Sequence, residues 1–340
     1  ELRKHRRESR KEVFQTEKVH FLTRLAPTSS LGVGQTLESR PYSREYQGTD
    51  LVENIKKMGG TWSTPSAQEI LASVSESERE GIEEVTIANE AQAGVTLFRA
   101  ISGEGADPEG TIDWVTHPVK DGVSPLFAPI PVKPDGTCDQ PPDRASMIRW
   151  LVKNAMFEYH INGKMFGIKR EDGNGYAAVM LCRPPNCTTD FLSELRAAWY
   201  AGITPPWEGK EPKLKHVKAR VELALEILGK CHKECVKGPH WYVYMLMVDP
   251  QCKGKGYAKR LLSFIAALSA RDLVPSYLEA TGERNEAIYN KRGYQTIKKY
   301  PIGEGKAEQI GGDPLTVNGG LAGMVRQPTP RTVTTVSSGK

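Results

Sequence analysis

Residues 248–258 read Val-Asp-Pro-Gln-Cys-Lys-Gly-Lys-Gly-Tyr-Ala, and this stretch decides the fold. An apolar run typical of a strand (241–248) precedes it, and a run with helical spacing (259–270) follows it. A strand that turns into a helix through closely spaced glycines leaves backbone N–H groups unpaired at the positive end of the helix dipole. Gly254 and Gly256 allow the backbone to approach a ligand where a Cβ would collide. The stretch therefore predicts a cradle for phosphate oxygens.

A second motif lies about thirty residues downstream. Residues 277–281 (Tyr-Leu-Glu-Ala-Thr) read as a short strand, and residues 284–292 read as a loop and a short helix. Gly293 ends this helix, and Tyr294 begins another strand-like run. The two motifs together predict a strand–turn–helix–strand–helix–strand unit.

This combination of motifs resembles the GNAT superfamily of acetyl-CoA-dependent N-acetyltransferases. The family's Gln/Arg-x-x-Gly-x-Gly/Ala pyrophosphate loop is matched by Gln251, Gly254 and Gly256. Its asparagine before a tyrosine-bearing helix is matched by Asn285 and Tyr289. The chain looks most like the branch that includes puromycin acetyltransferase and many fungal and algal relatives.

The resemblance implies an α/β fold (mixed α+β), the GNAT fold. Its mixed, mostly antiparallel sheet would be splayed at the acetyl-CoA site, where strands 240–248 and 276–281 diverge, with helices on both faces. The backbone at Met247 and Val248 would pair with the pantetheine arm, as a peptide adds a strand to a sheet edge. The residues expected to bind the coenzyme are Met247, Val248, Gln251, Cys252, Lys253, Gly254, Lys255, Gly256, Tyr257, Ala258 and Asn285.

Acetyl transfer to an amine also requires a polarised carbonyl, a base and an acid. By resemblance, a bulge near 246–248 supplies a backbone N–H that polarises the carbonyl. An unperturbed phenol has a pKa near 10, so Tyr289 is protonated at neutral pH and is the expected acid for the leaving thiolate. The alternative is that Tyr289 is only a packed aromatic side chain on a short helix. Glu279 is the expected base, although it could instead be a structural hydrogen-bonding group. Rival bases on the opposing strand are His240, Tyr242 and Tyr244.

Composition limits the other classes of function. The 340 residues are 39% hydrophobic, enough for one large domain or two small ones. No run of 18 apolar residues occurs, so we expect no membrane span. The net charge of +5 is a modest excess and does not indicate nucleic-acid binding.

Three regions are expected along the chain. Residues 1–81 read as a polar extension with one helix at 67–79, which Ser66 and Glu69 begin with a capping box. Residues 82–327 read as the GNAT domain, and 328–340 as a tail too polar to pack. The extension and tail are expected to be dispensable for folding and for coenzyme binding, and to dock a partner if they have a role.

Within the domain, hydrophobic periodicity predicts the remaining elements. A hairpin is expected where 165–170 and 176–182 flank a turn-rich segment. Residues 103–142 read as a long connection. The other expected strands and helices are 83–87 and 322–326 (strands) and 91–101, 144–159, 189–200 and 213–235 (helices).

The six cysteines show no spacing typical of a secreted scaffold. Cys231, His232, Cys235 and His240 suggest zinc, but the first three fall in an expected helix and match no standard zinc pattern. We therefore expect no metal and reduced, intracellular thiols. The chain begins at Glu1, so any targeting peptide would have been removed, and the cytoplasm and an organelle stroma or matrix both remain open. The thiolate of Cys252, beside lysines and a helix N-terminus, is expected to be favoured. The preferred interpretation is nevertheless that this thiol is incidental and that only the backbone of Cys252 is used.

Two functions follow. The first is transfer of acetyl from acetyl-CoA to a primary amine by direct attack in a ternary complex, because no cysteine nucleophile is paired with a base. The acceptor stays open among small molecules, protein N-termini and lysine side chains. The alternative is a GNAT-fold subunit, with weak or no activity, that binds a larger assembly through residues 1–81 or the tail.

Overall fold

The computed structural model describes residues 65–86, 88–102, 144–187, 212–310 and 320–329, all within the unit Pro65–Lys340. The expectations for the connection 103–142 and the helix at 189–200 lie outside these residues. So do those for most of the N-terminal extension and for the tail beyond residue 329.

A seven-stranded mixed sheet lies at the centre of the described part, in the order β1-β2-β3-β4-β5-β7-β6. β4 and β5 pair in parallel, and the other neighbouring strands pair antiparallel. The predicted mixed, mostly antiparallel sheet is therefore confirmed. The strands are β1 (Ile82–Glu84), β2 (Lys164–Lys169), β3 (Tyr176–Arg183), β4 (Trp241–Val248), β5 (Ser276–Thr281), β6 (Gln295–Tyr300) and β7 (Leu321–Arg326).

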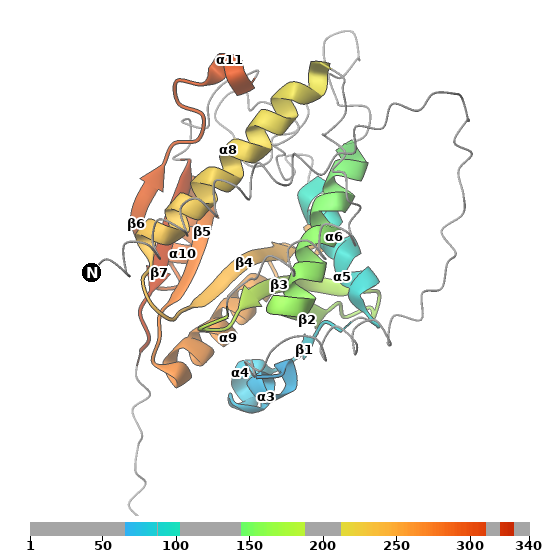
Figure 1. Cartoon of the computed structure of the whole chain (residues 1–340). Coiled ribbons are helices and arrows are strands. Elements are labelled where there is room, and N and C mark those ends of the chain that lie inside the picture. The colour runs from blue at the N-terminus through green and yellow to red at the C-terminus, as the bar shows by residue number, and fades with distance from the viewer. Residues whose placement is uncertain (1–64, 87, 103–143, 188–211, 311–319, 330–340) are drawn as a thin grey trace, which may run out of the picture. The chain divides into compact units, whose positions relative to one another are not determined.

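Helices cover both faces of the sheet, with α5, α6 and α8 on one side and α9 on the other (Figure 1). Strand alternation makes this possible, because successive side chains of β4 enter different cores. Trp241 and Val243 pack with α9, whereas Tyr242 packs with α8. The helices are α3 (Ala67–Ala72), α4 (Glu76–Arg79), α5 (Glu90–Ser102), α6 (Arg144–Asn162), α8 (Pro212–Cys235), α9 (Tyr257–Asp272), α10 (Glu283–Asn290) and α11 (Ala307–Ile310).

The helix α8 lies in the connection between β3 and β4, where a simple hairpin would have only a turn. It packs closely on β7. A Cβ added at Gly323 of β7 would lie 2.7 Å from Cys231 Sγ and 2.4 Å from Cys235 Sγ. Glycine at this position lets the helix approach the sheet. α8 therefore covers the β5–β7–β6 half of the face that it shares with α5 and α6.

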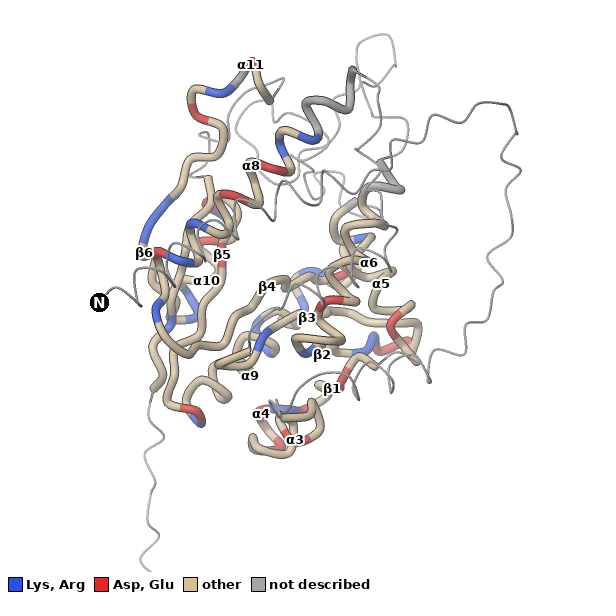
Figure 2. The backbone as a smooth tube through the Cα atoms, viewed as in Figure 1, with Lys and Arg blue, Asp and Glu red and all other residues tan. Residues whose placement is uncertain are grey.

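The edge strand β6 carries exposed lysines, which Figure 2 shows as basic residues along it. Lys298 and Lys299 pair with Glu234 at 2.6 Å and Glu286 at 2.8 Å. A register shift between Thr296 and Lys298 interrupts its pairing with β7. Charge and irregularity of this kind protect an edge from pairing with another chain.

The helix expected at 67–79 is two helices. The capping box at its start is present: Glu69 N–H donates to Ser66 Oγ at 3.1 Å, and Ser66 N–H donates to Glu69 Oε2 at 2.6 Å. A second capping box, Ser75 with Glu78, starts α4 after a turn. Periodicity did not show this break, because a second capping box can begin a new helix without changing the apolar spacing.

Residues 67–74 belong to the core beside α9. Ala67, Ile70 and Val74 are buried, and Ile70 is 0% exposed, in the same cluster as Phe166 and Phe264. Full burial of a valine or isoleucine side chain contributes about 1.5–3 kcal/mol. The sequence placed the domain boundary at 82; this packing leads us to propose a boundary near 65.

Shortened chains test this boundary. A chain of residues 65–329 should keep the unfolding midpoint of the full chain, whereas one of residues 82–329 should lose about 3 kcal/mol of unfolding free energy, because it lacks Ile70 and Val74. Denaturant unfolding of the two chains measures the difference. Equal stability of both would return the boundary to 82.

Candidate active site

The parallel strands β4 and β5 diverge. They pair only at Trp241–Ser276, Tyr242–Tyr277 and Val243–Leu278, although β4 continues to Val248 and β5 to Thr281. Beyond Val243 the facing edges of the two strands are therefore unpaired, while β3 and β7 hold their outer edges. The splay expected at the end of these strands is present.

A β-bulge at Tyr244 accompanies the divergence. Cys182 of β3 pairs with Val243, and the adjacent Leu181 pairs with Met245, so Tyr244 is the extra residue. Tyr244 and Met245 consequently both pack on the face of α5 and α6. The bulge was expected at 246–248 and lies slightly earlier.

The bulge determines which amides face the splay. Before it, Trp241 N–H donates to Pro275 O on the β5 side at 2.9 Å. After it, Asp249 N–H donates to Ala177 O of β3 at 2.9 Å. Since N–H groups alternate between the two edges of a strand, those of Leu246 and Val248 point toward the open gap. These donors lie where the sequence expected the one that polarises the acetyl carbonyl.

The turn after β4 uses its first amides internally. Asp249 Oδ1 accepts from Gln251 N–H at 2.9 Å, and Asp249 O accepts from Cys252 N–H at 2.8 Å. Lys253 N–H donates to Pro250 O at 3.4 Å, which completes the 3₁₀ turn η2 (Pro250–Cys252). The amides of Cys252 and Lys253, which the sequence assigned to the phosphate cradle, are thus already bonded.

The free amides begin at Gly254. Gly254 and Gly256 have φ of +81° and +84°, and a Cβ on either would meet no protein atom within 4 Å. Their left-handed backbone rather than protein crowding requires glycine. Across the described chain, the amides of 254–259 donate to no protein acceptor, since the first helical bond runs from Arg260 N–H to Gly256 O. The run of free amides, which is the candidate for the predicted cradle, therefore spans 254–259.

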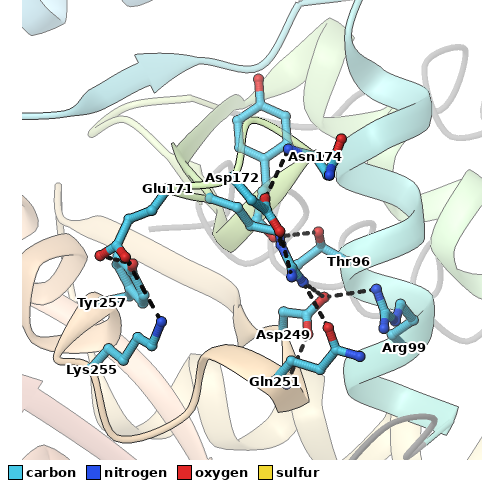
Figure 3. Close-up of polar contacts among 11 residues, drawn as sticks. Thr96, Arg99, Glu171, Asp172, Asn174, Asp249, Gln251, Lys255 and Tyr257 are labelled. Carbon is cyan, nitrogen blue, oxygen red and sulfur yellow. Dashed lines mark hydrogen bonds and ion pairs between the residues drawn. The ribbon is translucent and has the colours of Figure 1, made fainter.

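A buried ion-pair network fixes this turn to the rest of the fold (Figure 3). Asp249, 1% exposed, pairs through Oδ2 with Arg99 of α5 at 3.3 Å and with Arg170 at 3.5 Å. Arg170 also donates to Gln251 Oε1 at 3.1 Å and to Asp172 at 2.9 Å. The sequence did not predict this network, although the Asp-Pro at the strand end is a capping signal. Gln251 thereby positions the turn.

The β2–β3 hairpin contacts the other flank of the cradle. Tyr257 Oη donates to Glu171 Oε1 at 3.3 Å, and Lys255 Nζ lies 4.0 Å from Glu171 Oε2 (Figure 3). Glu171 is 80% exposed, so its pair with Lys255 is weak. Lys255 therefore remains available to an anion bound at the cradle.

Glu279 lies on the α8 face of β5. Tyr277 packs with α8 and Leu278 with α9, so alternation places Glu279 on the side of Tyr277. Its Oε1 is buried and has no hydrogen-bond partner in the described chain. Burial raises its pKa to about 7, against the opposing effect of hydrogen bonding from the Tyr277 and Tyr242 hydroxyls. A carboxylate with this pKa suits a general base near neutral pH.

Tyr289 lies on the opposite face. It packs against the α9-side core, and its ring meets that of Tyr294 at 6.1 Å. Burial, followed by the nearby Tyr294, raises its pKa well above the ordinary value, so the phenol stays protonated. Asn285 Nδ2 donates to Thr281 O at 2.9 Å, which ties α10 to the end of β5. The structure gives Asn285 a positioning contact; coenzyme binding by it stays a prediction.

The rival bases are less suited than Glu279. His240 Nε2 lies 2.8 Å from His232 Nε2, and burial lowers the pKa of both imidazoles, that of His232 to about 4. Burial raises the pKa of Tyr244 to about 12 and raises that of Tyr242 well above its ordinary value, so both phenols hold their protons. Burial thus moves the pKa of Glu279 toward neutrality and moves the pKa values of the three rivals away from it.

The cysteines are free thiols wherever the structure describes them. Burial raises the pKa of Cys252, which is 5% exposed, so the expectation of a favoured thiolate is wrong. Desolvation outweighs the nearby positive charges of Arg170 and Lys255. Cys231 Sγ and Cys235 Sγ lie 4.0 Å apart on one face of α8, facing Gly323.

A family comparison identifies the domain that these elements form. Residues 219–296 match the family model described as an acetyltransferase (GNAT) domain. The matched segment contains the splayed strands, the glycine turn and α10. The protein therefore carries a GNAT acetyltransferase domain and is an acyltransferase. The branch with puromycin acetyltransferase stays a prediction.

The solved structures similar to this chain include one bacterial and two insect proteins. One is described as a histone acetyltransferase HPA2 and related acetyltransferase from Corynebacterium glutamicum, at 18% identity and a TM-score of 0.42 over 74% of this chain and 98% of that one. Another is a mosquito arylalkylamine N-acetyltransferase-like 5b, at 16% identity and 0.42 over 72% and 98%. A third is a Drosophila melanogaster polyamine N-acetyltransferase, at 18% and 0.40 over 72% and 98%.

Two further findings concern the chain as a whole. No curated protein sequence matches it at a significant level. Among the helices that the structure describes, none combines the length and apolar character needed to cross a membrane.

Proposed function

We propose that the protein transfers acetyl from acetyl-CoA to a primary amine by direct attack in a ternary complex. The observation that carries this proposal is the run of free amides at 254–259 beside the unpaired edges of β4 and β5. A phosphate cradle adjacent to an open strand edge suits a ligand that has both a pyrophosphate and an amide-bearing arm. Acetyl-CoA has both.

The coenzyme would bind along β4 and the start of α9. The amides of 254–259 and the dipole of α9 would hold the pyrophosphate, with Lys255 beside it. The pantetheine arm would follow the backbone at Met247 and Val248. Leu246 N–H or Val248 N–H would donate to the carbonyl oxygen as it gains negative charge.

The two faces of the sheet separate the proton transfers. Glu279, on the α8 face, would take the proton of the attacking amine. Tyr289, on the α9 face, would donate its proton to the departing thiolate. The gap between β4 and β5 would hold the thioester between them.

The raised pKa values of the cysteine thiols support direct attack. Burial raises the pKa values of Cys182, Cys187, Cys231 and Cys252, which disfavours the thiolates that an acetyl-enzyme route requires. The alternative of a GNAT-fold subunit with weak or no activity depends on the extensions, and no observation on the described residues favours it.

Substitution of the two cradle glycines tests the coenzyme site. Gly254→Val with Gly256→Val should abolish measurable acetyl-CoA binding by titration calorimetry, because side chains and a non-left-handed backbone would displace the amides. Gly305→Val is the matched control, since Gly305 also has a positive φ (+71°) and open space around it. Unchanged affinity in the double variant would disprove the cradle. Equal loss in the control would assign the effect to folding.

A further inference from the structure

A polar cluster on the α8 face lies next to Glu279 and has unmet hydrogen-bonding capacity. Arg183 of β3 pairs in register with Tyr242 of β4, which pairs with Tyr277 of β5. Residues paired in register project to the same face. Arg183, Tyr242 and Glu279 therefore project from the same face of the sheet.

Aromatic side chains fill the space between these residues. The Tyr159 ring from α6 stacks on the Tyr244 ring at 5.1 Å, and Tyr244 meets Tyr242 at 6.0 Å. The Arg183 guanidinium lies 5.0 Å from the centre of the Tyr159 ring. Arg183 also forms an ion pair with Glu158 of α6.

Three buried polar atoms of this cluster have no partner in the described chain: Arg183 Nε, Tyr159 Oη and Glu279 Oε1. Tyr159 is 0% exposed, and the side chain of Arg183 is 20% exposed. Leaving such atoms unsatisfied costs about 1–3 kcal/mol each. The first two are hydrogen-bond donors, whereas ionised Glu279 is an acceptor.

We infer that the acceptor substrate is an amine with a carbonyl oxygen close to its amino group, an α-amino carbonyl compound. Its amino group donates to Glu279 Oε1, and its carbonyl oxygen accepts from Arg183 Nε and Tyr159 Oη. A polyamine or a simple alkylamine offers no oxygen to these two donors. This inference rests on the proposed function and specifies its acceptor. Amino acid amides and peptide N-termini share this chemistry.

Matched acceptors test the inference on the full chain. Phenylalaninamide and 2-phenylethylamine differ only in the carboxamide, and we expect kcat/KM per free-base amine to be about tenfold higher for the amide, as for one hydrogen bond to a charged donor. Spermidine and Nα-acetyl-lysine amide should resemble 2-phenylethylamine. A tripeptide with a free N-terminus separates the sources: it should match phenylalaninamide if the site accepts peptides, and fall below it if the acceptor is small.

Variants assign the preference to the two donors. Tyr159→Phe and Arg183→Met should each reduce, about tenfold, the ratio of kcat/KM for phenylalaninamide to kcat/KM for 2-phenylethylamine. Each variant is compared with the wild type at one pH, so the different basicities of the two amines cancel from the comparison. The double variant Glu158→Gln with Arg183→Met also removes the carboxylate that forms an ion pair with Arg183. Tyr294→Phe, which removes a buried hydroxyl on the opposite face, should leave the ratio unchanged.

Two outcomes would overturn the inference: equal rates with both wild-type acceptors, or an equal fall for both in the variants. The proposed function fails separately, if calorimetry shows no acetyl-CoA binding. In that event the preference is measured as equilibrium binding of the two amines to the wild-type chain and to Tyr159→Phe. Binding without preference would then also overturn it.

Discussion

Replacing Glu279 with glutamine should reduce turnover by roughly 10²–10⁴ and at the same time stabilise the protein at pH 8. Burial raises the pKa of this carboxyl from 4.5 to about 7, so the folded state holds the proton more tightly than the unfolded state does. Stability therefore falls as pH rises from about 4.5 to about 7, and the cost above pH 7 is about 3 kcal/mol. Glutamine is neutral and avoids that cost.

The pH–rate profile gives a second measurement of the same residue. Turnover of the wild type should rise with pH through about 7, as Glu279 ionises, and Glu279→Gln should lose this rise. No fall attributable to Tyr289 is expected up to pH 10, because burial raises the pKa of that phenol.

Glu234→Gln is the matched control for Glu279→Gln. Hydrogen bonds from Lys298 and Tyr300 lower the pKa of Glu234, so its loss should slightly destabilise the protein and leave turnover unchanged. A Glu279→Gln variant that is active and no more stable than the wild type at pH 8 would exclude the buried base.

Replacing Tyr289 with phenylalanine should reduce turnover by roughly 10²–10⁴ while acetyl-CoA affinity stays within about threefold. The substitution keeps the ring and its contact with Tyr294, and it removes the proton that the leaving thiolate needs. Single-turnover rates and calorimetric titration separate these two quantities.

Tyr294→Phe controls for the loss of a phenol beside the same core, because the two rings lie 6.1 Å apart. It should leave turnover within about twofold, since the only change is a hydroxyl with no expected role in proton transfer. Normal turnover in Tyr289→Phe, or an equal loss in both variants, would reduce Tyr289 to a packing residue.

Local sequence signals predicted the elements that carry the site. Alternation and the turn residues of 171–175 predicted the β2–β3 hairpin, and the glycine spacing predicted the turn from β4 into α9. The resemblance added the mixed, mostly antiparallel sheet and the splay between its strands at 240–248 and 276–281. These features are encoded within short windows, where backbone conformation depends on neighbouring residues.

Contacts between segments that lie far apart in the chain were not predicted from the sequence. Arg99, Arg170 and Asp249 form one network from three separate elements, and nothing in their local spacing indicates it. The inclusion of Ile70 in the core beside Phe264 is of the same kind.

The strand–turn–helix unit at 241–272 and the hairpin followed from the sequence, because both depend on local propensity and on glycine's access to positive φ. The resemblance added Tyr289 as the candidate acid. The tertiary structure added which amides are free, that desolvation of the half-buried Glu279 raises its pKa to about 7, and that Glu279 and Tyr289 lie on opposite faces. Burial and hydrogen-bond partners come from residues far apart in the chain. The register of β3, β4 and β5, with its bulge at Tyr244, brings them together.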